Sequence, residues 1–244
     1  MTELLYFPDK EYQKGFDARV IKPREEPKVD YDGYICLDKT LFYKEGGGQP
    51  ADQGTISWNG KTAEVVDVQK EHGEIRHYVQ TEEFPETDQN IRGEVNCERR
   101  YNHMRMHTAQ HVVSKVVLDM YNGSTAGNQI YEDYSRIDFK PVEFDWDDVE
   151  KIQNAANSII REELKVEKKE LPREQVEEMI ESGRTNLDLI PESVDPLRVV
   201  IIGDDDICPC GGTHVDNVRE IGEIEIVDLV SKGENVERLE FKLE

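Results

Sequence analysis

Two short segments of this sequence each carry a pair of side chains that can bind a metal ion. His107-Thr-Ala-Gln-His111 and Cys210-Gly-Gly-Thr-His214 place their metal-binding residues at the first and last positions. Imidazole nitrogen and thiolate sulfur are donors that suit zinc, which favours tetrahedral sets of four. Either pair alone is a weak signal. Together they predict a site for one zinc ion with His107, His111, Cys210 and His214 as its ligands.

Such a zinc ion has two interpretations. A site that keeps a position for water lowers the pKa of that water to about 7 and directs it at an ester or amide carbonyl. Four protein ligands would instead close the tetrahedron, as in a structural site. The sequence lacks the compact knuckles of a zinc ribbon and has enough residues for a core without a metal, which favours a catalytic role. Beyond the zinc-bound water, the sequence identifies no catalytic group.

The cysteines are few and are expected to be reduced. The chain of 244 residues contains 4 cysteines, and Cys208 and Cys210 are poorly spaced for pairing with each other. Cys208 is a candidate fifth donor, although a small buried side chain beside Pro209 is the interpretation we prefer. Cys36 and Cys97 lie in strand-like runs and are expected in the core.

A glycine-rich motif, Glu45-Gly46-Gly47-Gly48-Gln49-Pro50, is the third segment with a chemical signal. Three consecutive glycines cost conformational entropy and contribute no packing. A phosphate-binding loop would need a lysine and a following helix, and both are missing. A flexible loop is one interpretation. A loop brought close to a ligand or to the other domain fits the sequence better.

The segment before residue 97 is expected to consist of strands. Short apolar or β-branched runs are separated by turn signals, and Asn59-Gly60 is a strong hairpin signal. This pattern predicts a small β-barrel or sandwich. The expected strands are Phe16–Ile21, Tyr34–Leu37, Thr55–Trp58, Thr62–Val68, Ile75–Val79 and Ile91–Val95.

The apolar periodicity becomes helical from Glu98 to Tyr121. Its apolar stripe is expected to contain Ala109, Val112, Val113, Val116 and Met120. His107 and His111 lie one helical turn apart on a different face, roughly opposite that stripe. Both imidazole rings can therefore reach the same ion.

The remaining chain mixes helices with strands. A strand is expected over Gln129–Phe139, and a helix capped by Asp145 over Asp147–Leu164. The other expected elements are a short helix from Pro172 to Gly183, a buried strand at Leu197–Ile202 and a hairpin of Ile221–Val230 with Val236–Leu243. We therefore expect an α+β fold. A β-barrel-like domain in residues 1–92 precedes a two-layer α/β sandwich with a mainly antiparallel sheet in residues 93–244.

The chain is strongly acidic. The 53 Asp and Glu residues outnumber the 30 Lys and Arg residues, giving a net charge of −23. This surface disfavours non-specific binding to nucleic acid or to an anionic membrane. No apolar run approaches the ~20 residues that a membrane span requires, and the N-terminal residues lack a secretory signal. We expect a cytoplasmic protein, or one whose targeting segment was removed.

The three motifs, in this order, resemble those of the AlaX family, the free-standing alanyl-tRNA editing proteins. This family is related to the editing domain of alanyl-tRNA synthetase. The glycine motif and the N-terminal β domain resemble the medium-length class, over nearly the whole chain. Threonyl-tRNA synthetases have a similar editing domain, so Gly46-Gly-Gly-Gln-Pro50 is the motif that points to the alanine branch.

The resemblance implies hydrolysis of the ester between tRNA(Ala) and a wrong amino acid, chiefly serine and in some members also glycine. Binding of a small apolar side chain rejects near-isosteres poorly, so a second site that recognises the serine hydroxyl adds selectivity. The resemblance also implies the zinc ligands given above. The expected substrate-binding residues are Thr40, Gly46, Gly47, Gly48, Gln49 and Gln129. For Thr40, an ordinary β-strand threonine is the alternative interpretation.

Mischarged tRNA(Ala) is the expected partner, and the sequence leaves the oligomeric state open. A local basic cluster that includes His103 lies just before His107 and offsets the acidic surface. Its expected contacts with the tRNA acceptor end are Arg99, Arg100 and Arg105. Arg136 is a further candidate for this role, or for a salt bridge.

Two other functions remain compatible with the sequence. In one, the zinc is structural and the chain is a non-catalytic module that binds tRNA or a synthetase. In the other, the chain is a zinc hydrolase of another aminoacyl ester or of a small amide. Unfolding on loss of Cys210 would favour the first alternative, and activity without RNA would favour the second.

Overall fold

The computed structural model describes residues 2–204, 206–233 and 235–244, which form two compact units. The first unit contains Met1–Gly46 and Pro50–Asn102, and the second contains Gly47–Gln49 and His103–Glu244. In the described part of the chain, no helix combines the length and apolar character needed to cross a membrane.

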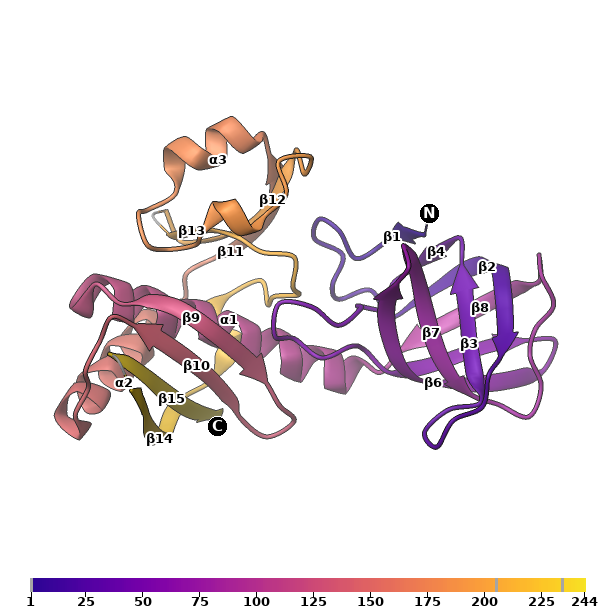
Figure 1. Cartoon of the computed structure of the whole chain (residues 1–244), viewed down its shortest axis with the longest axis horizontal. Coiled ribbons are helices and arrows are strands. Elements are labelled where there is room, and N and C mark those ends of the chain that lie inside the picture. Colours follow the sequence, from indigo (N-terminus) through magenta and orange to yellow (C-terminus); the bar gives the residue numbers. More distant parts are fainter. Residues whose placement is uncertain (1, 205, 234) are drawn as a thin grey trace. The chain divides into compact units, whose positions relative to one another are not determined.

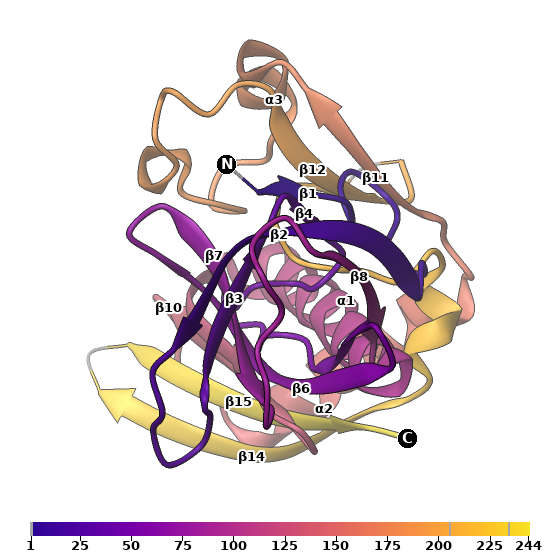
Figure 2. The same ribbon diagram turned by 90° about the vertical axis from the view of Figure 1, so that its right-hand side faces the viewer.

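The first unit contains a closed antiparallel barrel, which confirms the expected β-barrel (Figures 1 and 2). The strands follow the order β2-β3-β7-β6-β5-β8, and β8 pairs with β2 to close the barrel. Their bounds are β2 (Gly15–Glu25), β3 (Gly33–Leu37), β5 (Gly54–Trp58), β6 (Lys61–Glu71), β7 (Glu74–Gln80) and β8 (Asn90–Val95). A short parallel pair, β1 (Glu3–Leu4) with β4 (Lys39–Thr40), belongs to the same unit.

Local sequence explains the barrel strands. In β8, buried Ile91, Gly93 and Val95 alternate with exposed residues, as expected for a strand with one face toward a core. Asn59 and Gly60 connect β5 to β6 with φ values of 46° and 78°. Positive φ at both positions is the requirement of the two-residue hairpin turn that this dipeptide predicts.

The division between the units differs from the one expected at residue 92. Strand β8 pairs with both β2 and β5, so the barrel needs residues up to Val95. The segment Gly47–Gln49 is flanked in sequence by barrel residues but belongs to the second unit. No periodic pattern in the sequence indicates that these three residues belong to a different unit from their neighbours in the chain.

The second unit is an α+β arrangement with antiparallel sheets, in agreement with the expected fold class. One sheet has the order β14-β15-β10-β9, and the other has the order β11-β12-β13. Helices α1 and α2 pack against the first sheet (Figure 1). The bounds for the first sheet and its helices are α1 (Cys97–Tyr121), β9 (Ser124–Ile130), β10 (Ser135–Lys140), α2 (Trp146–Arg161), β14 (Ile224–Gly233) and β15 (Val236–Leu243). The residues of α1 before His103 belong to the first unit.

The second sheet carries the short helix α3 and leads into the Cys/His segment. Its elements are β11 (Val166–Leu171), α3 (Arg173–Met179), β12 (Leu197–Ile202) and β13 (Asp206–Pro209), with 3₁₀ turns at Leu187–Leu189 and Val218–Ile221. All residues of β12 are buried, as its continuous apolar run predicts. Leu197, Val199 and Ile201 pack with Val176 of α3 in a separate small core.

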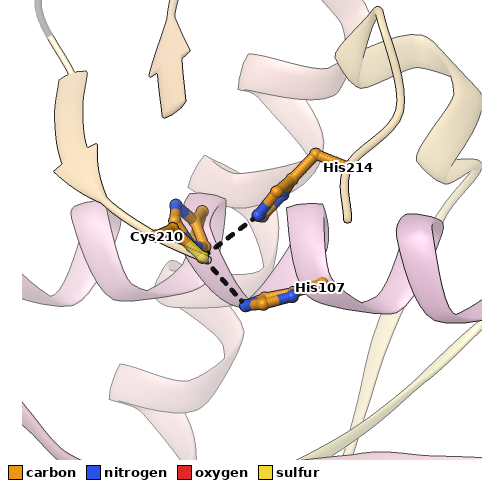
Figure 3. A group of neighbouring side chains, drawn as sticks. His107, Cys210 and His214 are labelled. Atoms are coloured by element: carbon orange, nitrogen blue, oxygen red, sulfur yellow. Dashed lines mark hydrogen bonds between the residues drawn. The ribbon is translucent and has the colours of Figure 1, made fainter. Parts of the chain in front are cut away.

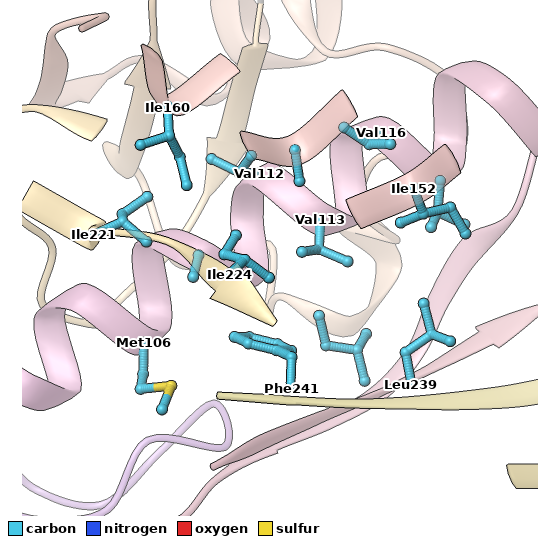
Figure 4. Close-up of a cluster of buried hydrophobic side chains, with 14 of the residues drawn as sticks. Met106, Val112, Val113, Val116, Ile152, Ile160, Ile221, Ile224, Leu239 and Phe241 are labelled. Atoms are coloured by element: carbon cyan, nitrogen blue, oxygen red, sulfur yellow. The ribbon is translucent and has the colours of Figure 1, made fainter. Parts of the chain in front are cut away.

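Helix α1 is buried on more faces than the sequence predicts. Val112, Val113 and Val116 lie in the main core of the unit with Phe241 of β15 (Figure 4), as expected. Met120, expected on the same stripe, is 45% exposed. The face that carries His107, His111 and Leu118 is also buried. The helix therefore separates an apolar core from a buried polar cluster, which a periodicity of apolar residues alone cannot reveal.

Three other elements refine the expectations. Asp145 caps α2, and its carboxylate accepts a hydrogen bond from the Asp148 backbone N–H. The single strand expected over Gln129–Phe139 is wrong, because β9 and β10 form a hairpin across this segment. The third helix ends at Met179, before the expected Gly183, and β11 was not expected from the sequence.

Candidate metal centre

The candidate ligands come from two elements of the second unit. His107 and His111 lie one turn apart on α1. Cys210 directly follows β13, and its backbone N–H donates to Arg198 O at 3.1 Å. The register of β13 on β12 therefore fixes where the cysteine begins its turn.

The donor atoms of His107, His111, Cys210 and His214 all lie within 4.8 Å of one another. Cys210 Sγ lies 3.5 Å from His107 Nε2 and 3.3 Å from His214 Nε2, and Figure 3 shows both rings pointing toward the sulfur. Tetrahedral zinc, with Zn–S of about 2.3 Å and Zn–N of about 2.0 Å, requires S···N separations of roughly 3.5 Å. The arrangement of these residues therefore fits a zinc ion.

Burial controls the protonation of the cluster. Burial lowers the pKa of His107 to about 3 and holds the pKa values of His111 and His214 well below their usual range. The imidazoles are therefore neutral near pH 7, as ligands must be. Burial also raises the pKa of the Cys210 thiol to about 11, so this sulfur requires a bound cation to release its proton at neutral pH.

The remaining ring nitrogens differ in their partners. His107 Nδ1 lies 2.8 Å from Gln49 Oε1, and His214 Nδ1 lies 3.2 Å from Thr108 Oγ1. The Thr108 hydroxyl donates to Met104 O, so it accepts from His214. His111 Nδ1 is buried and has no hydrogen-bond partner among the residues that the structure describes. An unpartnered buried nitrogen within this cluster agrees with a metal-binding role.

Two buried arginines hold the main chain of the ligands. Arg184 Nη2 donates to His111 O at 3.2 Å, and its guanidinium also binds the Asp206 carboxylate. Arg198 Nη1 donates to Cys210 O at 2.7 Å. After burial, the nearby positive charge of Arg184 contributes most to the low pKa of His111. Neither arginine was expected from the sequence, because no motif connects them to the ligands.

The two glycines between Cys210 and His214 have different roles. The Gly212 backbone N–H donates to Cys210 Sγ at 3.3 Å, and a Cβ atom at Gly212 would overlap the His107 ring. A Cβ at Gly211 would meet nothing within 4 Å. The turn thus needs glycine at the second position, where the backbone approaches a ligand closely.

The expected substrate-binding residues are distributed over both units. Gly47, Gly48 and Gln49 lie in the second unit with the metal cluster, together with Gln129 of β9, which is half-buried and donates to Ile130 O. Gly46 lies in the first unit, where its carbonyl accepts from the Tyr43 hydroxyl.

Thr40 is also in the first unit and is fully buried. Its hydroxyl lies 2.8 Å from His77 Nε2 and accepts the Phe42 backbone N–H. Both interactions occupy the hydroxyl inside the barrel unit. They agree with the alternative of an ordinary β-strand threonine.

The arginines expected to contact tRNA are more engaged with protein than the sequence indicates. Arg100 is 2% exposed, binds the Asp52 carboxylate and donates to the carbonyls of Glu11 and Leu41, so the expectation that it contacts tRNA must be corrected. Arg105 donates to the carbonyls of Ile221 and Glu220.

Arg99 donates to Ala51 O at 3.3 Å and is half-buried. Arg136, weighed as an alternative, forms a salt bridge with Asp138 and donates to the Tyr131 hydroxyl. Of the three arginines expected to contact tRNA, Arg99 is the one whose side chain is least engaged in hydrogen bonds with the protein.

Three further residues lie near the cluster but are not among its candidate ligands. Cys208 lies 3.1 Å from Thr185 Oγ1 and is not part of the donor group, as the preferred interpretation of a buried structural thiol predicts. Thr108 and Gln110, inside the histidine motif, were missed as supporting residues. Gln110 donates to Ser135 Oγ and accepts from Asn128 Nδ2, which connects α1 to β9 and β10.

Comparison with known proteins gives matches over most of the chain. The family model "tRNA synthetases class II (A)" matches residues 15–99, and "Threonyl and Alanyl tRNA synthetase second additional domain" matches residues 197–240. Alanyl-tRNA editing protein AlaX-M of Methanosarcina barkeri is 36% identical over 248 residues, covering 100% of this chain and 99% of that protein.

Longer relatives match over part of their length. Alanyl-tRNA editing protein AlaX-L of Pyrococcus horikoshii is 37% identical, and this chain spans 58% of its length. Alanine–tRNA ligase of Halobacterium salinarum is 36% identical over 98% of this chain and 26% of the ligase.

Proposed function

Because the chain belongs to the family of alanyl-tRNA editing proteins, we propose that it is a zinc-dependent deacylase of tRNA(Ala) mischarged with serine. The glycine ester is the second substrate to test. The convergence of His107, His111, Cys210 and His214 carries this proposal, because it provides a complete donor set for zinc in the unit that also holds Gln129. Cytoplasmic tRNA(Ala) is the proposed partner.

The chain's own residues would prepare the reaction in three ways. The buried neutral histidines and the cysteine hold the ion, and the Gly212 N–H stabilises negative charge on Cys210 Sγ. When bound, a zinc ion that keeps a position for water would supply Lewis acidity and an activated water for attack on the ester carbonyl. Selectivity for serine over alanine requires polar groups that pair with the serine hydroxyl and stay unpaired with alanine. We propose Gln129 among these groups.

The test is hydrolysis of purified Ser-tRNA(Ala), Gly-tRNA(Ala) and Ala-tRNA(Ala) by the full chain. We expect release of serine and much slower release of alanine, loss of activity after metal chelation, and recovery with added zinc. Equal inertness toward the three esters would overturn the proposal. Equal hydrolysis of serine esterified to tRNA(Ala) and to a short mimic of the acceptor end would instead indicate an ester hydrolase that does not recognise tRNA.

One observation favours a second candidate function. All four donors are protein side chains in mutual reach, which is the composition of a closed structural zinc site. The chain would then be a tRNA- or synthetase-binding module without its own chemistry. In that case Cys210→Ala should unfold the second unit, whereas the deacylase proposal predicts a folded variant without activity. Circular dichroism and thermal unfolding of the zinc-free variant separate the two.

A further inference from the structure

The central part of the glycine-rich motif is docked on β9 in the second unit. The Ile130 backbone N–H donates to Gly48 O at 2.8 Å, and Asn128 Nδ2 donates to Gly47 O at 3.1 Å. Gly48 has a φ of +80°, and a Cβ there would lie 2.8 Å from Asn128 O. The loop is therefore held in one place, and only glycine fits at its closest approach to the strand.

This docking places the carboxamide of Gln49 against the metal cluster. Gln49 is 0% exposed, and its Oε1 lies 2.8 Å from His107 Nδ1 and 3.0 Å from the Thr213 backbone N. Its Nε2 donates to Thr213 Oγ1 at 2.8 Å. Gln49 thus contacts one ligand directly and holds the turn that carries another, His214.

The contacts determine which way the carboxamide faces and which nitrogen of His107 carries the proton. A backbone N–H can only donate, so the Gln49 atom that faces Thr213 N must be the oxygen. The same oxygen faces His107 Nδ1, which must therefore be the protonated nitrogen. His107 Nε2 is then left with a free lone pair on the side of Cys210 Sγ. This is the tautomer that a metal ligand needs.

We propose that Gln49 is a positioning residue for the metal site, not a substrate-binding residue. Its oxygen fixes His107 in the Nδ1-protonated form and aims Nε2 at the donor cluster. This inference rests on the proposed zinc site. It also revises the expectation for the glycine motif: Gly48 permits the close approach of the loop to β9, and Gln49 is the group that the loop brings to the metal cluster.

Two substitutions of equal length separate hydrogen bonding from packing. Gln49→Glu keeps an oxygen that accepts from both His107 Nδ1 and Thr213 N, whereas Gln49→Met fills similar space and offers only a weak sulfur acceptor. We expect Gln49→Met to weaken zinc binding by about 10- to 100-fold and Gln49→Glu to bind zinc at least as tightly as the unmodified chain. Competition of the full chain with a chromophoric chelator measures both affinities without any tRNA.

A second measurement reads the tautomer itself. In the zinc-free unmodified chain, nitrogen NMR of the imidazoles should show His107 protonated at Nδ1, and Gln49→Met should lose this preference. Equal zinc affinities for the Met variant and the unmodified chain, or equal weakening by Met and Glu, would overturn the proposal. If Gln49→Met does not fold, protonation of His107 at Nε2 in the unmodified chain would overturn it.

Failure of this inference is distinguishable from failure of the proposed function. A chain that binds zinc with the expected Gln49 dependence but leaves Ser-tRNA(Ala) intact keeps the positioning role and loses the deacylase proposal. A chain that hydrolyses Ser-tRNA(Ala) with zinc affinity indifferent to Gln49 keeps the deacylase and loses the positioning role.

Discussion

The buried His77 of the barrel unit and the buried histidines of the candidate metal centre have opposite hydrogen-bonding patterns. His77, in the barrel unit, has both ring nitrogens occupied, Nδ1 by Ile35 O and Nε2 by Thr40 Oγ1, each at 2.8 Å. In the second unit, His107 and His214 each use only Nδ1 for a neutral partner and turn Nε2 toward Cys210 Sγ.

The difference separates a structural histidine from a candidate ligand. A buried polar group is costly unless it is paired, and the pairing of His77 is complete within the protein. The metal-binding atoms of His107, His214 and Cys210 in the second unit face one another, and such facing lone pairs are stabilised by a hydrogen or a cation placed between them. Burial alone therefore does not distinguish a structural histidine from a candidate ligand, because it lowers the pKa of His77 to about 4 and that of His107 to about 3.

A buried ion pair in each unit shows the same difference. In the barrel unit, Arg100 and Asp52 bind each other, and Arg100 uses its remaining donors on backbone carbonyls. In the second unit, Arg184 pairs with Asp206 and also donates to His111 O. The first pair stabilises the fold alone, whereas the second also positions a ligand. The following predictions test this contrast, from the largest expected effect to the smallest.

Loss of a ligand should have the largest effect. Replacing Cys210 by alanine removes the sulfur donor, and we expect zinc affinity to fall by more than the roughly 100-fold that loss of an outer partner costs. Hydrolysis of Ser-tRNA(Ala) should be lost with the metal. Replacing His77 by glutamine should leave one tightly bound zinc. Metal analysis of both variants after dialysis measures the bound zinc. Retention of zinc by the Cys210 variant would contradict the distinction between His77 and the candidate ligands.

The buried charge of the barrel unit should be the next most sensitive feature. Arg100→Met leaves Asp52 without its cation in a buried site, and removal of one partner of such a pair costs about 3–5 kcal/mol. Urea unfolding should show this loss in the transition of the barrel unit. Arg99→Gln is the matched control, expected to change stability by less than about 0.5 kcal/mol. Weaker tRNA binding by Arg100→Met without destabilisation would restore the role predicted from the sequence.

The convergence of the candidate metal ligands was more predictable from the sequence than the placement of the residues that support them. The candidate ligands follow from donor types and equal spacing, and the barrel strands follow from alternation and turn signals. Both are local properties of the sequence. Arg184 and Arg198 support the ligands from distant positions in the chain, and no local pattern connects them to the site.

The wrong expectations have a common physical cause. Arg100 lies in a basic run of the sequence, but its partner Asp52 is brought to it only by the fold of the barrel unit. The hairpin of β9 and β10 was hidden because the residues that connect the two strands, 131–134, include no glycine or proline to indicate a turn. Charge and alternation describe each residue correctly, but tertiary pairing decides what the residue does.

Acidification should destabilise the protein through His77. Its pKa is about 4 in the fold because burial disfavours the charged ring, against about 6.5 when unfolded. Protons therefore bind more tightly to the unfolded chain. The contribution of neutral His77 to the free energy of unfolding is fully present above pH 6.5 and is lost as the pH falls toward 4. Between pH 7 and 5 the loss should be about 2 kcal/mol. Urea unfolding of the chain and of His77→Gln at both pH values isolates this part, and equal losses in the two would contradict it.

The smallest effect should distinguish neighbouring glycines in the turn from Cys210 to His214. Gly212→Ala adds a methyl group that overlaps His107 and lies 2.9 Å from Gln49 Oε1, whereas Gly211→Ala adds one in open space. We expect the former to weaken zinc binding about 10-fold, at the lower end of the cost of disturbing a ligand's outer partner, and the latter to leave it unchanged. Chelator competition measures both. Equal zinc affinities of the two variants would mean that the His107 ring can shift without cost. The arrangement of the metal-binding atoms, which distinguishes this cluster from the fully hydrogen-bonded His77, would then be imposed by the metal and not by the protein.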